Sequence, residues 1–414
     1  MQTADAAVPE RPNPRPALAA VLGSRSYLLL WSAQFASLVA GFFNYVAVAW
    51  LVLQLTSSTL AVGSVLAAAS IPSAILMLLG GAVSDRFSPR MTMLVAGVVR
   101  GAVMVVLAGL TLAHLVQLWE LFAAAVLVGS TTAFFVPAGM AMLPRVVSTD
   151  QLPAGNALLN LSRTGAMVLG SAAAGVVVAA LGAGTALGVD AAGSVLAAIL
   201  VVPLPSSSAA RPGNASNPLS DIRDGLRYAW RDVPLRTALI VVAVLNLGAL
   251  GAIEVGLPAL AHGRLSEGAA ALGTSFAAWG IGSTAGSLLG GTRVLPGHFG
   301  WFMVGTVALI GAGVAAAGIA PTLAVLIVIM VLLGVVEGLA TTYLLSWLQG
   351  RTDPTMQGRV MAIAMLASVG LEPVALAVAG AVASQDLGLL FWASAAAIEL
   401  TAFGAALSRS VRRM

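Results

Sequence analysis

The chain contains no cysteine and no lysine, and only 9% of its 414 residues are charged. The absence of cysteine excludes disulfides and thiolate metal sites. A soluble chain would carry about 25% charged residues, whereas 59% of this chain is hydrophobic. The composition therefore indicates an integral membrane protein.

The sequence also lacks catalytic motifs, clusters of metal-ligand residues and a basic stripe that could bind nucleic acid. The three histidines, His114, His262 and His298, fall in three different predicted loops, so we expect no metal site. We find no nucleophile–base pair, no phosphate-binding loop and no extramembrane domain that could hold an ATPase. The arginines lie at loop ends rather than in one stripe, which gives no indication of nucleic-acid binding. We expect no enzyme activity, no catalytic residues and no cofactor.

Long apolar segments predict an all-α fold with twelve membrane-spanning helices, since one crossing takes about 20 apolar residues. Seventeen of the twenty arginines fall in the tails and in loops on the side of the termini, and such residues accumulate in cytoplasmic loops. We therefore expect both termini in the cytoplasm. The predicted spans are about 27–54, 59–83, 91–113, 117–141, 152–181, 184–204, 236–261, 267–290, 299–319, 321–348, 356–384 and 387–407.

The segments outside the spans divide the chain. Proline-rich residues 1–24 predict a disordered cytoplasmic tail, and residues 409–414 form a second tail. Two six-helix bundles take residues 25–204 and 236–408, joined by a linker at 205–235. Within this linker residues 218–231 predict an amphipathic helix in the cytoplasmic membrane surface. Its apolar face consists of Leu219, Ile222, Leu226 and Trp230.

A charged loop between the second and third spans carries a recognisable motif. Gly81, Asp85, Arg86 and Arg90 match the pattern Gly-x-x-x-Asp-Arg-x-Gly-x-Arg/Lys, with Ser88 in place of the second glycine. This loop resembles the signature loop of the major facilitator superfamily. The resemblance implies two six-helix bundles related by pseudo-two-fold symmetry, with spans 1, 4, 7 and 10 lining a central cavity.

Further short segments resemble the branch of this family that exports macrolides, other drugs and the siderophore enterobactin. A glycine run in span 5 also resembles the antiporter glycine motif, with Ser171 where proline is usual. The matching segments are Gln34-x-x-Ser37, Leu55–Ser58, Pro137-Ala138, Leu143-Pro144, Asn156–Leu159, Gly358–Val360 and the run Gly165, Gly170, Gly175.

Seven ionisable residues lie well inside the spans, away from their ends, and a charged side chain at the bilayer centre costs at least about 2.5–3.5 kcal/mol of insertion free energy. On the helix arrangement that the resemblance implies, Glu254, Glu337, Glu372 and Arg163 reach the cavity, although each could instead bond to neighbouring backbone. The other three, Arg100, Asp190 and Glu399, lie on supporting helices, and we interpret them as structural, with Arg100 a counter-ion within its own bundle.

The cavity residues suggest how transport could be coupled to an ion gradient. A carboxyl group in a low-dielectric cavity takes up a proton more readily than one in water. We expect Glu337 and Glu372, with Glu254 third, to bind protons or cations. Gln34 and Asn44 in span 1 could bond substrate or hold helices together.

These observations predict a monomeric secondary transporter of the bacterial inner membrane. We expect it to export an amphipathic drug or siderophore by alternating access, as a proton antiporter in the lipid bilayer. A uniporter or importer of a neutral or cationic metabolite is one alternative, and a transporter-like membrane sensor is another.

The signature loop predicts a gate. We expect Asp85 to bond the start of span 11 near Gly358 and Arg359, braced by Arg86 and Arg90, and to release it when the cavity opens inward. Asp85→Asn should abolish most transport but leave folded protein in the membrane, as judged by transport assays and size-exclusion chromatography. Normal transport by this variant would remove the gate role, and Asp5→Asn in the tail is the control.

Overall fold

The computed structural model describes residues 14–206, 218–292, 297–353 and 356–412, and within these ranges the chain is helical without any strand. The first bundle begins with the short helix α1 (Pro14–Gly23). Its long helices are α2 (Arg25–Thr56), α3 (Thr59–Phe87), α4 (Pro89–Leu112), α5 (Leu118–Val146) and α6 (Leu152–Val201), with the 3-10 turn η1 (Thr149–Gln151) before α6. α6 is two helices that meet at Gly182, where φ is 83°, a conformation that glycine adopts without steric cost.

The second bundle follows α7 (Pro218–Arg231). Its first rod consists of α8 (Val233–Gly251), the π-helical turn η2 (Ala252–Gly256) and α9 (Leu257–Gly263). The next helices are α10 (Ala269–Thr292), α11 (Phe299–Gly318) and α12 (Leu323–Arg351). A broken helix then comprises α13 (Gln357–Val369) and α14 (Glu372–Ala383), and the bundle ends with α15 (Leu387–Leu407) and the short α16 (Arg409–Arg412).

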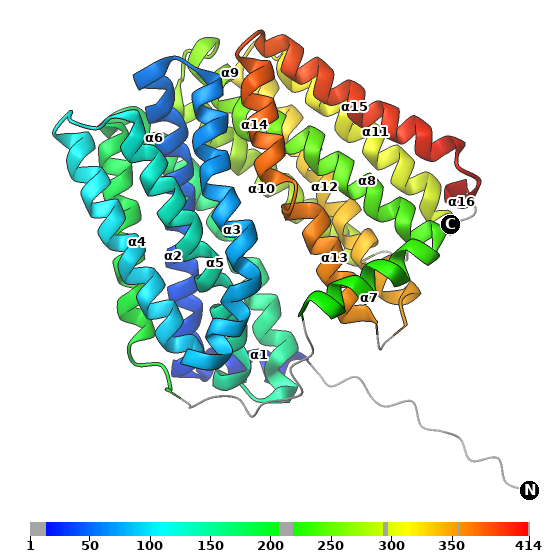
Figure 1. Ribbon diagram of the computed structural model, residues 1–414, viewed down its shortest axis with the longest axis horizontal. Helices are drawn as coiled ribbons and strands as arrows, with labels where there is room; N and C mark the ends of the chain where they lie inside the picture. The colour runs from blue at the N-terminus through cyan, green and yellow to red at the C-terminus, as the bar shows by residue number, and fades with distance from the viewer. Residues whose placement is uncertain (1–13, 207–217, 293–296, 354–355, 413–414) are drawn as a thin grey trace, which may run out of the picture.

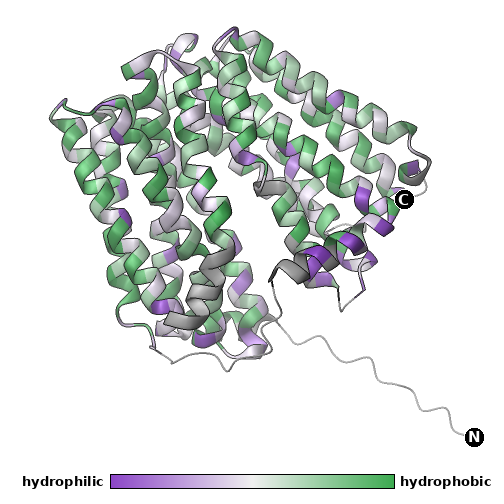
Figure 2. Ribbon diagram, in the orientation of Figure 1, coloured by the Kyte–Doolittle hydropathy of each residue, from purple (hydrophilic) through white to green (hydrophobic). Residues whose placement is uncertain are grey.

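The helices are long and apolar enough to cross a membrane. Ten stretches of the described residues meet the length and hydropathy expected of a span. One of them contains both halves of α6, and α10 is a further 24-residue helix outside the ten. Figure 2 shows apolar residues along the helices and polar residues gathered at α7 and at helix ends. The all-α membrane fold is confirmed, and the number of twelve crossings stays a prediction.

The two ends of the molecule are distinguished by its short helices. We name the end near α1 and α7 the α1–α7 end, and the opposite end, with the α2–α3 and α14–α15 turns, the far end (Figure 1). At far-end turns, polar side chains satisfy the free backbone N–H groups that begin each helix. The Ser58 hydroxyl accepts from Ala61 N–H, Thr322 from Val325 N–H, and Asp386 from Leu389 N–H.

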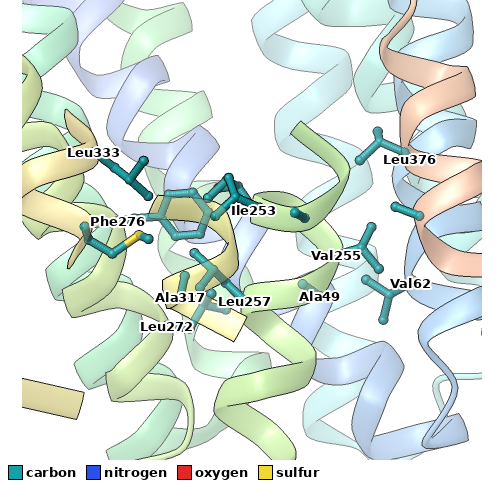
Figure 3. Packing of buried hydrophobic residues seen from close by; sticks show 14 of the residues in the cluster. Ala49, Val62, Ile253, Val255, Leu257, Leu272, Phe276, Ala317, Leu333 and Leu376 are labelled. Carbon is teal, nitrogen blue, oxygen red and sulfur yellow. The ribbon is translucent and has the colours of Figure 1, made fainter. Parts of the chain in front are cut away.

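The bundles contact each other through glycines near the far end. A Cβ on Gly63 of α3 would lie 2.8 Å from Cα of Gly380 on α14, and one on Gly175 of α6 would lie 2.8 Å from Cα of Gly273 on α10. Because no side chain intervenes, backbone packs directly against backbone. Around these crossings Val62, Val255 and Leu376 belong to one buried apolar cluster (Figure 3).

The structure differs from the sequence expectations in three places. Residues Pro14–Gly23, expected to be disordered, form α1 because Val21 is fully buried in an apolar cluster with Tyr27 and Leu30. The span expected at 356–384 is broken at 370–371, where Pro373 lacks the N–H that a continuous helix needs. The span at 236–261 contains the π-helical turn η2. The helix expected at 218–231 is α7 with the same bounds.

α7 packs beneath the second bundle rather than standing apart from it. Asp232, directly after α7, forms an ion pair with Arg351 at the end of α12, with Arg351 Nε 2.9 Å from Asp232 Oδ2. The Asp353 backbone N–H donates to the Tyr228 hydroxyl. Ala229 is buried, whereas Leu226 and Trp230 are 44% and 54% exposed. Part of the predicted apolar face therefore remains available to a membrane surface.

Ser88 joins α3 to α4 in a conformation that disfavours its side chain. Its φ is 82°, and a non-glycine residue in such a region costs about 1–3 kcal/mol. Its hydroxyl accepts from Met91 N–H as the cap of α4, and replacing such a serine by glycine costs only a few tenths of a kcal/mol. We expect Ser88→Gly to stabilise the protein by about 1 kcal/mol, measured as a higher thermal midpoint in detergent.

The matched control for this substitution is Ser58→Gly. Ser58 caps α3 in the same way but has a φ of −114°. Glycine therefore relieves no strain there, removes the cap and adds chain entropy to the unfolded state. This control should lower the thermal midpoint slightly. Equal midpoints for the two variants would contradict the strain at Ser88.

Candidate functional site: the cavity between the bundles

A cavity of about 1180 Å³ lies between the two bundles and receives side chains from both. Small-molecule sites usually enclose about 300–1,000 Å³, so this cavity can hold a drug-sized molecule. It extends from the contacts near the far end toward the α1–α7 end, where the bundles diverge (Figure 1). Its polar lining includes Asn44, Arg100, Thr131, Arg163, Ser194, Asn246, Glu254, Ser283, Thr306, Glu337 and Thr341.

The closed end of the cavity is held by contacts between the bundles. The Tyr45 hydroxyl of α2 donates to the backbone carbonyl of Glu254 at 2.8 Å. Nearer the far end, the rings of Trp50 and His262 meet edge to face with centroids 5.1 Å apart. The Thr59 hydroxyl lies 3.4 Å from the carbonyl oxygen of Gly380. The cavity is thus sealed on one side.

On the first-bundle wall, Arg100 of α4 is paired with Asp190 of α6. Its Nη2 lies 3.1 Å from Oδ1, and its Nε donates to the same oxygen. Ser194 donates to this carboxylate as well, and Asp190 is fully buried. Arg100 is a counter-ion within its own bundle, as expected, yet one side of it also lines the cavity.

The other predicted residues of the first bundle are placed differently from one another. Arg163 is exposed and lines the cavity. Asn44 also lines it, and its amide donates to the Met104 sulfur at 3.1 Å. Gln34 is not among the lining residues, because its amide packs against Gly139 of α5. Its Nε2 is buried without a hydrogen-bond partner in the described part of the chain.

The second-bundle wall carries two carboxylates into the cavity. Glu337 of α12 is half-buried; Ser283 donates to its Oε2 at 2.7 Å and Thr341 to its Oε1 at 3.3 Å. Glu254 projects from η2, and such π-helical turns occur frequently at functional sites. Glu372 is the first residue of α14, a helix that contacts η2, but it is not among the lining residues.

The gate residues are only partly described. The surroundings of Gly81 and Gly358 and the side chains of Asp85 and Arg86 lie outside the described part of the structure, so the predicted bond between Asp85 and span 11 stays a prediction. Arg90 donates to the carbonyl of Val202 at the end of α6. Arg359 lies on α13, with Nη1 3.6 Å from the Met356 sulfur.

Several lining residues were not anticipated. Tyr45, Phe276 and Trp279 form an aromatic set at the closed end, with neighbouring ring centroids 5.2 and 6.0 Å apart. Ser283 orients Glu337 from a different helix. Hydroxyls and aromatic rings are common in membrane helices, so their types alone do not indicate which of them face a cavity.

The comparisons with known proteins identify the family. The sequence model of the Major Facilitator Superfamily matches residues 30–371, so the chain belongs to this family. It is therefore a multi-pass membrane protein of a family of transporters.

Curated relatives match part of the chain. An uncharacterized MFS-type transporter, y4rN, from Sinorhizobium fredii is 29% identical over 259 residues, which are 60% of this chain and 62% of that protein. The multidrug efflux pump Tap from Mycobacterium tuberculosis is 29% identical over 225 residues, 51% of this chain and 52% of Tap. The chain thus matches less than two thirds of the length of these relatives.

Solved structures share the fold over nearly the whole chain. The nucleoside transporter NupG superposes with a TM-score of 0.71 at 14% identity and covers 92% of this chain and 98% of its own. A bacterial homologue of the human lysosomal transporter Spinster, in an inward-facing and unoccupied conformation, has a TM-score of 0.65 at 14% identity. It covers 96% of this chain and 97% of its own.

The glycine crossing between α6 and α10 generates a prediction about the seal. A Cβ on Gly273 would lie 2.7 Å from Cα of Gly175, and such overpacking costs about 1–3 kcal/mol. Gly273→Ala should therefore shift the equilibrium away from the state closed at the far end by roughly 5- to 150-fold.

The native chain lacks cysteine, so labelling can measure this shift. Val62 is 1% exposed beside the seal; in the Val62→Cys background, Gly273→Ala should accelerate maleimide labelling at least several-fold. Gly109→Ala is the control, because a Cβ there meets no atom within 4 Å. Equal labelling rates in the two variants would show that the α6–α10 crossing does not hold the seal.

Proposed function

We propose that this transporter exports an amphipathic small molecule, a drug or a siderophore, from the bacterial cytoplasm in exchange for protons. Export requires a cavity that can be loaded from the cytoplasmic side and then exposed to the outside. The observation that carries the proposal is the cavity itself, which combines drug-sized volume, mostly apolar walls and two carboxylates with a seal at one end.

The arginine distribution supports the orientation that export needs. Among the described residues, most arginines lie in helices and turns at the α1–α7 end, and basic residues favour the cytoplasmic side of a membrane. We therefore assign the α1–α7 end to the cytoplasm of an inner-membrane protein. In this orientation the structure corresponds to the inward-facing state, sealed toward the outside. The exchange with an outward-facing state would separate the glycine crossings and close the gate around Asp85.

The carboxylates of the second bundle supply a means of coupling to protons. Glu337 and Glu254 line the cavity, and Glu254 and Glu372 lie at the two helix irregularities, η2 and the α13–α14 break. Ionisable residues inside membrane helices are uncommon, and in pumps and transporters they serve in proton relays. The export direction draws on the similarity to Tap, whose name describes a multidrug efflux pump.

The test is export from cells and its dependence on pH. A host without its own efflux pumps should gain resistance to cationic or neutral amphipathic drugs, or secrete a siderophore intermediate, when it expresses this chain. Glu337→Gln combined with Glu372→Gln should remove export against a gradient and its pH dependence but leave downhill exchange of substrate. Glu267→Gln is the control, since Glu267 lies in an exposed far-end turn.

Two outcomes would contradict the proposal. If no compound is exported and vesicles instead take up a metabolite, the direction is wrong. If the double variant still concentrates substrate with normal pH dependence, these carboxylates do not couple transport to protons.

A further inference from the structure

The two walls of the cavity carry opposite charges at the same height. Near the closed end α6 and α10 run against each other, and a Cβ on Gly280 would lie 2.8 Å from the Val168 side chain and 3.4 Å from that of Met167. Arg163 precedes Met167 by four residues and Ser283 follows Gly280 by three. Both residues therefore lie about one helical turn beyond this contact, toward the α1–α7 end. Ser283 holds Glu337, so Arg163 and Glu337 lie at the same level on opposite walls.

Glu337 is oriented but not neutralised. Ser283 donates to one of its oxygens and Thr341 to the other, and an ionised carboxylate offers about four acceptor positions. Two positions are therefore free, and no basic side chain in the described structure is paired with it. This wall can accept hydrogen bonds from an ammonium group.

Arg163 is the complementary group on the other wall. It is exposed and lines the cavity, and no partner for its guanidinium is found in the described part of the chain. Arg100, the other arginine of this wall, is already neutralised by Asp190. The N–H groups of the planar Arg163 guanidinium can therefore bind a carboxylate through two parallel hydrogen bonds.

An aromatic surface lies next to these two charges. Trp279 precedes Ser283 by one turn of α10 and stacks obliquely on Phe276, which in turn meets Tyr45 of the first bundle. All three rings line the cavity. They provide an apolar surface for an aryl group just beyond the level of the two charged residues.

We propose that the cavity recognises amphipathic zwitterions: an aryl body on Tyr45, Phe276 and Trp279, an amine at Glu337 and an acidic group at Arg163. This inference rests on the proposed function for the identity of the cavity as the substrate site and names the substrate class. A zwitterion bridges the two walls and satisfies both charges, whereas a simple cation leaves Arg163 unpaired.

Equilibrium binding to the purified full-length protein tests this substrate class. The probes are a fluoroquinolone with a free amine and a free carboxylate, its ethyl ester, which retains only the amine, and its N-acetyl derivative, which retains only the carboxylate. Because Trp279 lines the cavity, tryptophan fluorescence can follow binding, with calorimetry as a second measurement. The zwitterion should bind at least about tenfold more tightly than either derivative.

Variants of Arg163 and Glu337 test which residue binds the carboxylate of the probe and which binds its amine. Arg163→Gln should remove the advantage of the zwitterion over the ester but leave ester binding unchanged, which also shows that the variant is folded. Arg163→Lys should restore part of the advantage. Glu337→Gln should remove the advantage over the N-acetyl derivative. Arg227→Gln on exposed α7 and Glu267→Gln are the matched controls and should change none of these affinities.

The proposal is wrong if the ester binds as tightly as the zwitterion, if Arg163→Gln weakens both equally, or if none of the three probes binds. These measurements need neither a gradient nor a transport direction. A failure of export with the binding pattern retained would therefore contradict the proposed function alone, and export without the binding pattern would contradict only the substrate class.

Discussion

Direct backbone-to-backbone packing between the bundles is the constraint on which the cavity depends. Gly63 meets Gly380 where α3 crosses α14, and Gly175 meets Gly273 where α6 crosses α10. Each crossing pairs the second long segment of one bundle with the fifth long segment of the other, so the two are related by the pseudo-two-fold axis of the fold. Side chains at these points would hold the bundles apart and open the far end. In lipid, where apolar burial gives little drive for helix association, such close contact is what joins helices.

Polar groups inside the bundles are satisfied in two different ways. In the first bundle Arg100 and Asp190 neutralise each other, with a hydroxyl adding a hydrogen bond to the carboxylate. In the second bundle Glu337 has hydroxyl partners, and no ion pair to it is found among the described residues. The first arrangement is stable in any conformation because both partners lie within one bundle. In the second arrangement the Glu337 carboxylate must be satisfied by water, a proton or a solute. Such a requirement suits a residue that takes part in transport.

Much of the fold could be predicted from the sequence because the helices are long and their ends carry clear signals. The bounds of α7 followed from its charge pattern and Pro218. The turn η2, the break before Glu372 and the helix α1 were missed. Pro373 was a usable signal for the break, but a π-helical turn changes one residue of register and leaves no mark in an apolar segment.

The candidate site was harder to predict than the fold. Ionisable residues stand out in membrane segments, so Glu254, Glu337 and Arg163 could be named in advance. Which way each points could not be derived, because helices that are apolar all round have no preferred face. Gln34 and Glu372 were therefore expected to line the cavity like the other candidates. Neither is among the residues that line it. The aromatic set depends on contact between α2 and α10, more than 200 residues apart, which no local pattern encodes.

The opposed charges of Arg163 and Glu337 have a consequence for coupling under the proposed function. Two unit charges 4 Å apart attract by about 1 kcal/mol in bulk water and by about 4 kcal/mol at an effective dielectric constant of 20. Closing the α1–α7 end would expel water and bring the walls together, so the attraction across the cavity would grow during closure. A proton on Glu337 cancels that attraction, and an amine bound to Glu337 competes for the same carboxylate. The carboxylate can hold a proton or pair with an ammonium group but cannot do both at once. One residue can thus make substrate and proton mutually exclusive, which is the condition that antiport requires.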